Sequence, residues 1–461
     1  MDSPQNVLLA SDGLQVGVDG VRRSSTVICA PIMAESVDKM VIDMGKAKAL
    51  GADLVEVRLD HLKDFNCNED LKILIKESPL PTLVTYRPKW EGGQYDGDEK
   101  YRLDALRLAM ELGADFIDVE LQVPTIGLVM GEKGLISRIL CAKFGGFLTF
   151  GSLDSGIVSA PGQPTIKNIL HLYNFRQIGP DTKVFGIIGK PVSHSKSPML
   201  YNEAFKSVCF NGVYVHLLVD DIAKFLHTYS SKDFAGFSVT IPHKEAALEC
   251  CDEVDPVAKA IGAINCIIRR PTDGKLFGFN TDYVGAISAI EDGLKGSHNS
   301  VSLTGSPLAG RLFVVIGAGG AGKALAYGAK QKGARIAIAN RTYDRARELA
   351  DTIGGDALSL ADLDNFHPED GMILANTTSI GMQPKVDETP ISKHALRSYS
   401  LVFDAVYTPK MTRLLKDAKE SGAIVVSGLE MFIGQAYEQF ERFTGLPAPV
   451  ELFRRVMDGS S

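Results

Sequence analysis

A glycine-rich turn between a short apolar run and an alanine-rich segment is the first stretch whose residue types could do chemistry. Residues 311–316 read Arg-Leu-Phe-Val-Val-Ile and lead into Gly317-x-Gly319-x-x-Gly322, after which the pattern becomes helical. This order predicts a strand, a tight turn and a helix. The first glycine permits the turn, the second lets backbone approach a pyrophosphate, and the third lets the helix pack closely on the strand. A second strand predicted at 334–340 completes a βαβ unit, so the sequence indicates a dinucleotide site.

The end of that second strand indicates which nicotinamide dinucleotide is bound. A site for NAD places Asp or Glu there to accept from the ribose hydroxyls, whereas this chain has Asn340, Arg341 and Thr342, followed by Arg345 one helical turn later. A guanidinium can pair with a 2′-phosphate through two parallel hydrogen bonds. The sequence therefore predicts NADP as the cofactor. The alternative is that both arginines only solvate the start of a helix.

Composition excludes several classes of function. With 461 residues, 45% hydrophobic and 23% charged, the chain is an ordinary soluble globular protein of about two to four domains. Lys plus Arg number 49 against 56 Asp plus Glu, giving a net charge of −7 and no basic run, so we expect no nucleic-acid partner. No apolar run approaches the roughly 20 residues of a membrane span. The seven cysteines show no zinc or redox spacing, and we expect no metal and a reducing compartment.

The N-terminal third alternates short apolar runs with helical patterns. Residues 1–25 contain several aspartates, which suit a transit peptide poorly, and we expect a disordered tail. From residue 26 the alternation predicts a parallel sheet. Strands are predicted at 26–31, 52–58, 82–87, 114–120, 125–130 and 147–150, with helices at 37–50 and 100–112 among those between them. Polar residues cluster at the predicted carboxyl ends of the strands, where a βα barrel binds its ligands: Glu56, Arg58, Arg87, Glu91, Arg138 and Gln163.

The rest of the chain divides into further segments of the same kind. A linker at 176–183 leads to a second alternating segment, and a Gly- and Ser-rich join at 296–310 precedes the nucleotide unit. An amphipathic helical tail covers 429–457. The predicted domains are 26–178, 184–303, 304–427 and a C-terminal helical return at 428–457.

Several polar motifs in the last two thirds of the chain resemble those of shikimate dehydrogenase. They are Ser-His-Ser-Lys-Ser-Pro at 193–198, Ser-Val-Thr-Ile-Pro-His-Lys at 238–244, Gly-Ala-Ile-Asn at 262–265, Asn-Thr-Asp at 280–282, Asn-Arg-Thr at 340–342, Asn-x-Thr-Ser-x-Gly-Met at 376–382, Asp-x-Val-Tyr-x-Pro at 404–409 and Gly-x-x-Met-x-x-x-Gln at 428–435. The segment before them resembles type I 3-dehydroquinate dehydratase. The tandem resembles the plant-type bifunctional enzymes of aromatic amino-acid synthesis. The resemblance implies an α/β protein with an incomplete TIM-type βα barrel, an α/β substrate domain and a Rossmann NADP domain.

The resemblance also assigns roles to residues whose chemistry suits them. Reduction of a ketone needs a proton for the developing alkoxide, and the family's catalytic pair corresponds to Lys244 and Asp282. A small polyhydroxylated carboxylate needs short hydroxyls and amides, supplied by Ser195, Ser197, Thr240, Asn265, Tyr407 and Gln435. The implied cofactor residues are Gly317, Gly319, Gly320, Ala321, Gly322, Asn340, Arg341, Thr342, Arg345, Thr378, Gly428 and Met431. His194 and His243 are assigned to loop packing, and Cys266 to the core.

Two other functions are compatible with this pattern. Quinate dehydrogenases of the family tend to vary the positions held here by Ser197 and Thr240, so shikimate is favoured. A catalytically silent NADP-binding sensor or scaffold would not need both Lys244 and Asp282. We expect small-molecule partners only, 3-dehydroshikimate or shikimate and conceivably 3-dehydroquinate, and a monomer. The family resemblance implies the plastid stroma, with the cytosol as the alternative.

The dehydratase-like segment departs from its family. That family uses a Schiff-base lysine near the end of a strand and a histidine on an earlier strand, yet residues 26–167 contain no lysine so placed, and their one histidine, His61, does not match. At 120–124 the chain passes from the family's fourth strand to what resembles its seventh, so two βα units are missing. About 150 residues remain of a fold that usually takes about 250. We expect an open or strained barrel and an inactive dehydratase that keeps its binding shell.

Overall fold

The computed structural model describes residues 26–118, 134–154, 163–296 and 305–459. Two compact units make up the chain, one up to Val184 together with Lys196–Leu218, the other Phe185–Ser195 together with all residues from Val219 onward. Three predicted segments lie wholly or partly outside the described residues: the tail at 1–25, the strand at 125–130, and residues 297–304 of the join at 296–310. No helix in the described part of the chain is long and apolar enough to cross a bilayer.

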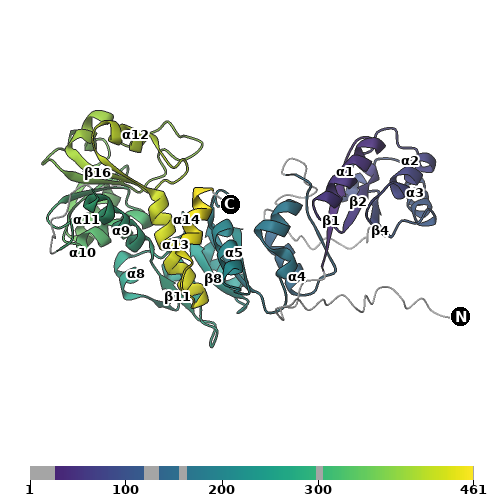
Figure 1. Cartoon of the computed structure of the whole chain (residues 1–461), viewed down its shortest axis with the longest axis horizontal. Coiled ribbons are helices and arrows are strands. Elements are labelled where there is room, and N and C mark those ends of the chain that lie inside the picture. The colour runs from purple at the N-terminus through teal and green to yellow at the C-terminus, as the bar shows by residue number, and fades with distance from the viewer. Residues whose placement is uncertain (1–25, 119–133, 155–162, 297–304, 460–461) are drawn as a thin grey trace. The chain divides into compact units, whose positions relative to one another are not determined.

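The first unit is built on a parallel sheet (Figure 1). Its strands are β1 (Val27–Ile32), β2 (Leu54–Arg58), β3 (Thr82–Thr85), β4 (Phe116–Asp118) and β5 (Leu148–Phe150). Its α-helices are α1 (Val37–Ala49), α2 (Cys67–Lys76), α3 (Glu99–Glu111) and α4 (Gly134–Lys143), followed later in the chain by α5 (Ser197–Ser207) and the strand β7 (Gly212–Leu218). The strands predicted near 26, 52, 82, 114 and 147 and the helices predicted at 37–50 and 100–112 are confirmed.

The strand order explains how this sheet relates to a barrel. The order is β4-β3-β2-β1-β5, and every pair is parallel, including β1 with β5. In a βα barrel the last strand closes on the first, which is the relation of β5 to β1. Within the described residues β4 and β5 each pair with one strand only, so the sheet is an open part of a barrel. All three residues of β4 are half-buried, whereas every residue of β2 is buried.

The second unit begins with five strands of a mixed sheet. They are β6 (Lys183–Gly189), β8 (Phe234–Val239), β9 (Glu253–Val254), β10 (Cys266–Arg269) and β11 (Leu276–Phe279), in the spatial order β6-β8-β10-β11-β9. Helices α6 (Ile222–Thr228), α7 (Ala246–Glu249), α8 (Pro256–Ile261) and α9 (Asp282–Lys295) follow the strands in sequence. Strand β10 is antiparallel to both β8 and β11, so its amino end lies beside the carboxyl ends of those two neighbours.

A six-stranded parallel sheet follows in the same unit. Its strands are β12 (Leu312–Ile316), β13 (Arg335–Asn340), β14 (Asp356–Ser359), β15 (Met372–Asn376), β16 (Tyr399–Asp404) and β17 (Ile424–Ser427). Their spatial order, β14-β13-β12-β15-β16-β17, is 3-2-1-4-5-6 in sequence order, which is that of Rossmann dinucleotide-binding folds. The predicted Rossmann fold is therefore confirmed. The order reverses between β12 and β15, and ligands of such sheets bind outside the carboxyl ends of the strands at that point.

Alternate residues along these strands pack on opposite faces of the sheet. Phe313 and Val315 of β12 belong to a core that includes α9, α10 (Gly320–Gln331) and α11 (Tyr343–Ile353). Val314 and Ile316 belong to a second core that includes α12 (Arg413–Glu420). Because both faces are covered, the strands are almost continuously apolar, as expected for a parallel sheet. The predicted helical tail forms α13 (Gly428–Thr444) and α14 (Val450–Asp458), and α13 lies along α9 (Figure 1).

A buried carboxylate joins the carboxyl ends of β15 and β16. Asp404 has no solvent exposure, and it accepts hydrogen bonds from Asn376 Nδ2 at 3.0 Å, Thr412 Oγ1 at 2.6 Å and the Val406 amide at 3.1 Å. Burial raises the pKa of Asp404 to about 6, although these hydrogen bonds act to lower it. The folded protein therefore holds the proton of Asp404 more tightly than the unfolded chain does.

Replacing Asp404 should change how stability depends on pH. Because its folded pKa lies above the ordinary 3.8, the wild type loses stability as the pH rises through the window from 3.8 to about 6. Asp404→Asn does not titrate and keeps a group that Asn376 and Thr412 can contact. Urea unfolding should therefore show Asp404→Asn gaining up to ~3 kcal/mol relative to the wild type across this window, with no further gain above it. Parallel pH curves for the two proteins would contradict the assignment.

Candidate active site

Three loops of the second unit meet because of the register of β8, β10 and β11. Cys266, the first residue of β10, pairs with Ser238 near the end of β8 and with Phe279 at the end of β11. The residues after β8, before β10 and after β11 therefore emerge at one edge of the mixed sheet. These are the segments that carry Lys244, Asn265 and Asp282.

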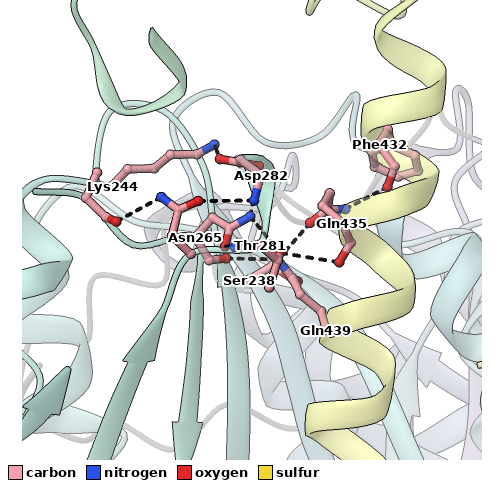
Figure 2. A network of polar contacts seen from close by, with 10 residues as sticks. Ser238, Lys244, Asn265, Thr281, Asp282, Phe432, Gln435 and Gln439 are labelled. Atoms are coloured by element: carbon pink, nitrogen blue, oxygen red, sulfur yellow. Dashed lines mark hydrogen bonds and ion pairs between the residues drawn. The ribbon is translucent and has the colours of Figure 1, made fainter. Parts of the chain in front are cut away.

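Lys244 and Asp282 form an ion pair at this edge (Figure 2). Lys244 Nζ lies 2.5 Å from Asp282 Oδ2, and the two side chains are 14% and 5% exposed. Asp282 is the first residue of α9, where the amide groups of the helix N-terminus stabilise a negative charge. The predicted catalytic pair is thus brought together, and the lysine keeps further N–H donors in a largely dry site.

Asn265 and Thr281 hold the carboxylate in place. Asn265 Nδ2 donates to Asp282 Oδ1 at 2.8 Å, and Asn265 Oδ1 accepts from the Thr281 amide at 2.8 Å. All three residues are buried. Since each oxygen of Asp282 has its own donor, the orientation of the carboxylate is fixed on both sides.

Helix α13 contributes two glutamines to the same network (Figure 2). Gln439 Nε2 donates to Gln435 Oε1 at 2.7 Å, to Asn265 O at 3.2 Å and to Thr281 Oγ1 at 3.2 Å. The Ser238 hydroxyl donates to Gln439 Oε1. Gln435 also donates to Phe432 O at 2.9 Å. Gln439 therefore connects the C-terminal helix to Ser238, Asn265 and Thr281, which lie far from it in sequence.

The structure places the other predicted substrate residues as follows. Thr240 comes directly after β8, and its amide donates to Ile188 O at 2.9 Å. The Tyr407 ring packs on Phe432 with 4.8 Å between centroids, which puts it against the helix that carries Gln435. Ser195 lies in the loop after β6 in the same unit, and Ser197 begins α5 in the other unit. Thus Asn265 and Gln435 join the hydrogen-bonded network, while Thr240 and Tyr407 border elements that carry it.

The predicted dinucleotide turn has the close approaches that require glycine. Gly317 has a φ of 109°, which favours glycine, and a Cβ on Gly322 would lie 2.0 Å from Gly317 O. A Cβ on Gly319 would meet nothing within 4 Å, so space is open above this residue. A Cβ on Gly320 would come within 2.8 Å of Lys244 Cβ. The turn therefore fits a pyrophosphate and lies directly against the stem of the lysine.

The remaining predicted cofactor residues border the carboxyl edge of the parallel sheet. Asn340 ends β13, Thr342 is the N-cap of α11 and Thr378 follows β15, while Gly320 and Ala321 begin α10, and Gly428 and Met431 lie in the first turn of α13. Arg341 is exposed and makes no ion pair within the described residues. Arg345, on α11, has its NH2 3.1 Å from Glu245 Oε1.

The first unit gathers charged residues at the carboxyl edge of its sheet. Glu56 of β2 is buried, and burial raises its pKa. Arg58 donates through Nε and NH2 to the two oxygens of Asp60, both at 2.9 Å. Although burial acts to raise the pKa of Asp60, its hydrogen bonds and charge pairing with Arg58 hold that pKa below the ordinary value. Arg87, after β3, pairs with Asp118 of β4.

The other three residues of this predicted cluster are Arg138, Glu91 and Gln163. Arg138 was expected near the carboxyl end of a strand, and the strand predicted before it, at 125–130, lies outside the described residues. Arg138 lies on α4, and its Nε donates to Phe150 O, at the end of β5, at 2.7 Å. Glu91 lies in a short 3-10 helix, 3.7 Å from Arg87 NH1, and Gln163 is buried. The guanidinium of Arg138 thus still reaches a strand's carboxyl end.

Some interpretations of single residues are confirmed, and other contributors were missed. His243 is buried with Nε2 2.8 Å from Val219 O, and Cys266 is a buried thiol whose pKa is raised by desolvation. Gln439 was not predicted, although it lies four residues after Gln435 on the same face of a helix, a spacing that could have indicated it. Glu245 was missed too, since nothing in its sequence position indicates its distant partners.

Comparison with known families places these units. The type I 3-dehydroquinase model matches residues 28–125 and, as a separate match, 122–180. The model of the shikimate dehydrogenase substrate-binding domain matches 187–267, that of shikimate/quinate 5-dehydrogenase 302–405, and that of the shikimate 5′-dehydrogenase C-terminal domain 428–457. Lys244 and Asn265 lie within the substrate-binding match and the glycine turn within the shikimate/quinate 5-dehydrogenase match, whereas Asp282 lies between these two matches.

Individual relatives agree. A chloroplastic bifunctional 3-dehydroquinate dehydratase/shikimate dehydrogenase of Arabidopsis thaliana is 62% identical over 531 residues, covering 98% of this chain and 88% of the relative. A shikimate dehydrogenase (NADP⁺) of Bacillus cereus is 35% identical over 281 residues, 60% of this chain and 97% of the relative. A crystal structure of Thermus thermophilus shikimate 5-dehydrogenase with NADP(H) and shikimate is 31% identical, with a TM-score of 0.52, and covers 61% of this chain and all of that one.

Removing the amide of Gln439 should weaken the fold around the site. Gln439→Leu keeps similar volume but deletes its hydrogen bonds to Ser238, Thr281 and Gln435 in a buried setting. The free energy of unfolding should fall by on the order of 2–4 kcal/mol in urea titrations. The matched control is Glu438→Gln on the same helix, which removes an exposed ion pair with Arg442 and should cost less than about 0.5 kcal/mol. Equal losses for both variants would refute the structural role of Gln439.

Proposed function

The chain belongs to the family of bifunctional 3-dehydroquinate dehydratase/shikimate dehydrogenases, and on this premise we propose that its second unit reduces 3-dehydroshikimate to shikimate with NADPH. It is an oxidoreductase family of the shikimate pathway that uses NADP. The observation that carries the proposal is the Lys244–Asp282 pair, 2.5 Å apart, beside the glycine turn of a Rossmann sheet.

The pair can deliver a proton where hydride addition creates an alkoxide. Lys244 Nζ has donors beyond the one it gives to Asp282, so it can hydrogen-bond a substrate oxygen and pass a proton to it. Asp282 keeps the ammonium in position and is itself fixed by Asn265. Because the site is largely buried, these charge interactions are stronger than they would be in water.

The cofactor site fits a phosphorylated dinucleotide. Bound NADPH supplies the hydride. Gly317 and Gly322 allow the tight turn, and the open space above Gly319 at the start of α10 allows a pyrophosphate to approach the helix N-terminus. We assign Arg341 and Arg345 to the 2′-phosphate, with Asn340, Thr342, Thr378, Gly428 and Met431 around the rest of the cofactor.

The substrate site is proposed to consist of hydroxyl and amide groups from the motifs that resemble those of the family. Asn265, Gln435, Thr240, Tyr407, Ser195 and Ser197 are the residues we assign to shikimate. No feature of the structure favours quinate over shikimate, and retention of both Lys244 and Asp282 argues against a silent NADP-binding scaffold. The domain limits we propose are 26–178, 184–303, 304–427 and 428–457. We also propose that the protein is a monomer. Its proposed location is the plastid, by analogy with the chloroplastic relative.

We propose that the first unit does not dehydrate 3-dehydroquinate. None of the five described strands of its parallel sheet contains a lysine, and His61 lies in a 3-10 helix beside Asp60, with its pKa lowered by burial. The dehydratase family model matches in two pieces that meet at 122–125, where two βα units are proposed to be missing. The alignment with the Arabidopsis relative is longer than the 461 residues of this chain, which supports an internal deletion.

Substitution of the proposed proton donor tests the dehydrogenase. Lys244→Ala should lower turnover with 3-dehydroshikimate by a factor on the order of 10²–10⁴, as is typical when a general acid is lost, while NADPH affinity changes little. NADPH absorbance gives the rate, fluorescence titration gives the affinity, and assays of the reverse reaction with shikimate and quinate define the preferred substrate. The control is Lys385→Ala, which removes an exposed ion pair of the same unit. Near-normal turnover in Lys244→Ala would overturn the mechanism.

Borohydride trapping tests the first unit. With 3-dehydroquinate and borohydride, the wild type should give no covalent adduct on any lysine before residue 184. Strands β1 to β5 carry no lysine, and the one buried lysine in the described part of this unit, Lys143, lies on α4 and donates to Pro180 O. Intact-mass and peptide mass spectrometry would detect an adduct, and the Arabidopsis relative treated in parallel serves as the positive control. An adduct on any lysine of the first unit would refute the proposed inactivity.

A further inference from the structure

A carboxylate next to the catalytic lysine bridges two cationic residues of the dinucleotide domain. Glu245 directly follows Lys244 in the chain. Its Oε2 lies 3.0 Å from Lys323 Nζ, in the first turn of α10, and its Oε1 lies 3.1 Å from Arg345 NH2, in the first turn of α11. One acidic side chain therefore contacts both the helix that follows the glycine turn and the helix that follows the second strand.

Ion pairs as exposed as these contribute little to the stability of the fold. The side chains of Glu245 and Arg345 are 39% and 53% exposed, and ion pairs of this kind usually contribute at most about 1 kcal/mol. Arg341, four residues before Arg345, makes no ion pair in the described part of the chain. Of the two arginines assigned to the 2′-phosphate, only Arg345 already has an anionic partner.

We propose that Glu245 competes with the 2′-phosphate of NADP for Arg345, and that it thereby sets the affinity and selectivity for the phosphorylated cofactor. This inference rests on the proposed role of Arg345. A phosphate monoester carries about −1.5 to −2 charges at neutral pH, so it outcompetes a single carboxylate for the guanidinium. The two anions repel each other when they share it. Part of the phosphate's interaction with Arg345 is therefore lost in displacing Glu245.

The competition has a consequence that distinguishes it from a structural contact. A ligand without a 2′-phosphate leaves the Glu245–Arg345 pair intact, so Glu245 affects its affinity only through Lys323. A ligand with a 2′-phosphate binds more tightly when the Glu245 charge is removed. The gain should shrink as salt is added, because exposed charges are screened over about 10 Å at 0.1 M ionic strength.

Calorimetric titration of the full chain with two fragments of the cofactor tests this. At low ionic strength, Glu245→Gln should raise the affinity for adenosine 2′,5′-bisphosphate about three- to tenfold more than it raises the affinity for 5′-AMP, whose phosphate can also profit from the release of Lys323. The gain that tests the inference is this excess. The control is Asp351→Asn, which removes the same charge from the far end of α11, where Asp351 lies 3.9 Å from Arg347, and should alter neither affinity. An unchanged or weaker bisphosphate affinity in Glu245→Gln would overturn the inference.

Arg345→Ala separates this inference from the function on which it rests. If Arg345→Ala alone leaves bisphosphate affinity unchanged, the assigned role of Arg345 fails, and the competition fails with it. If Arg345→Ala weakens the bisphosphate but Glu245→Gln has no effect, only the competition fails. In the double variant the gain from Glu245→Gln should disappear. A gain that persists without Arg345 would also overturn the inference, since Glu245 would then act through another group.

Discussion

The architecture of the second unit depends on keeping one ion pair both dry and oriented. A lysine and a carboxylate removed from water cost more than their mutual attraction returns unless their remaining polar atoms are also satisfied. Asp282 meets this condition through Lys244 on one oxygen, Asn265 on the other and the amino end of α9 beneath it. These groups can converge only because β10 runs antiparallel between β8 and β11. The mixed sheet is therefore the means by which residues far apart in sequence share one carboxylate.

The second constraint is steric, and it links the glycine turn to Lys244. The stem of Lys244 packs where a side chain on Gly320 would be, and the glycine turn closes only because Gly322 has no Cβ to meet Gly317 O. The side-chain stem of Lys244 thus packs directly on the backbone at the start of α10. A site assembled in this way gains precision from packing of main chain, which has less freedom to rearrange than long side chains do.

Local patterns in the sequence predicted most of the elements and the residues at their ends. The βαβ period and the glycine spacing led to the Rossmann order, and the motif residues Lys244 and Asp282 do form a pair. What the sequence could not supply were pairings set by tertiary packing. Gln439 meets Ser238 across 201 residues, and Glu245 meets Arg345 across 100.

The sheet of the first unit, which within the described residues is an open part of a barrel, keeps its five strands paired. Each parallel pair from β4 to β5 satisfies its own backbone groups, so the ladder does not need the strands that we propose are missing. Strand β4, at the end of the described sheet, is only half-buried, whereas β2, inside the sheet, is fully buried. At the carboxyl ends, Arg58 and Arg87 are paired with Asp60 and Asp118. Because their charges are already matched inside the protein, these guanidiniums would have to exchange partners before they could bind an anionic ligand.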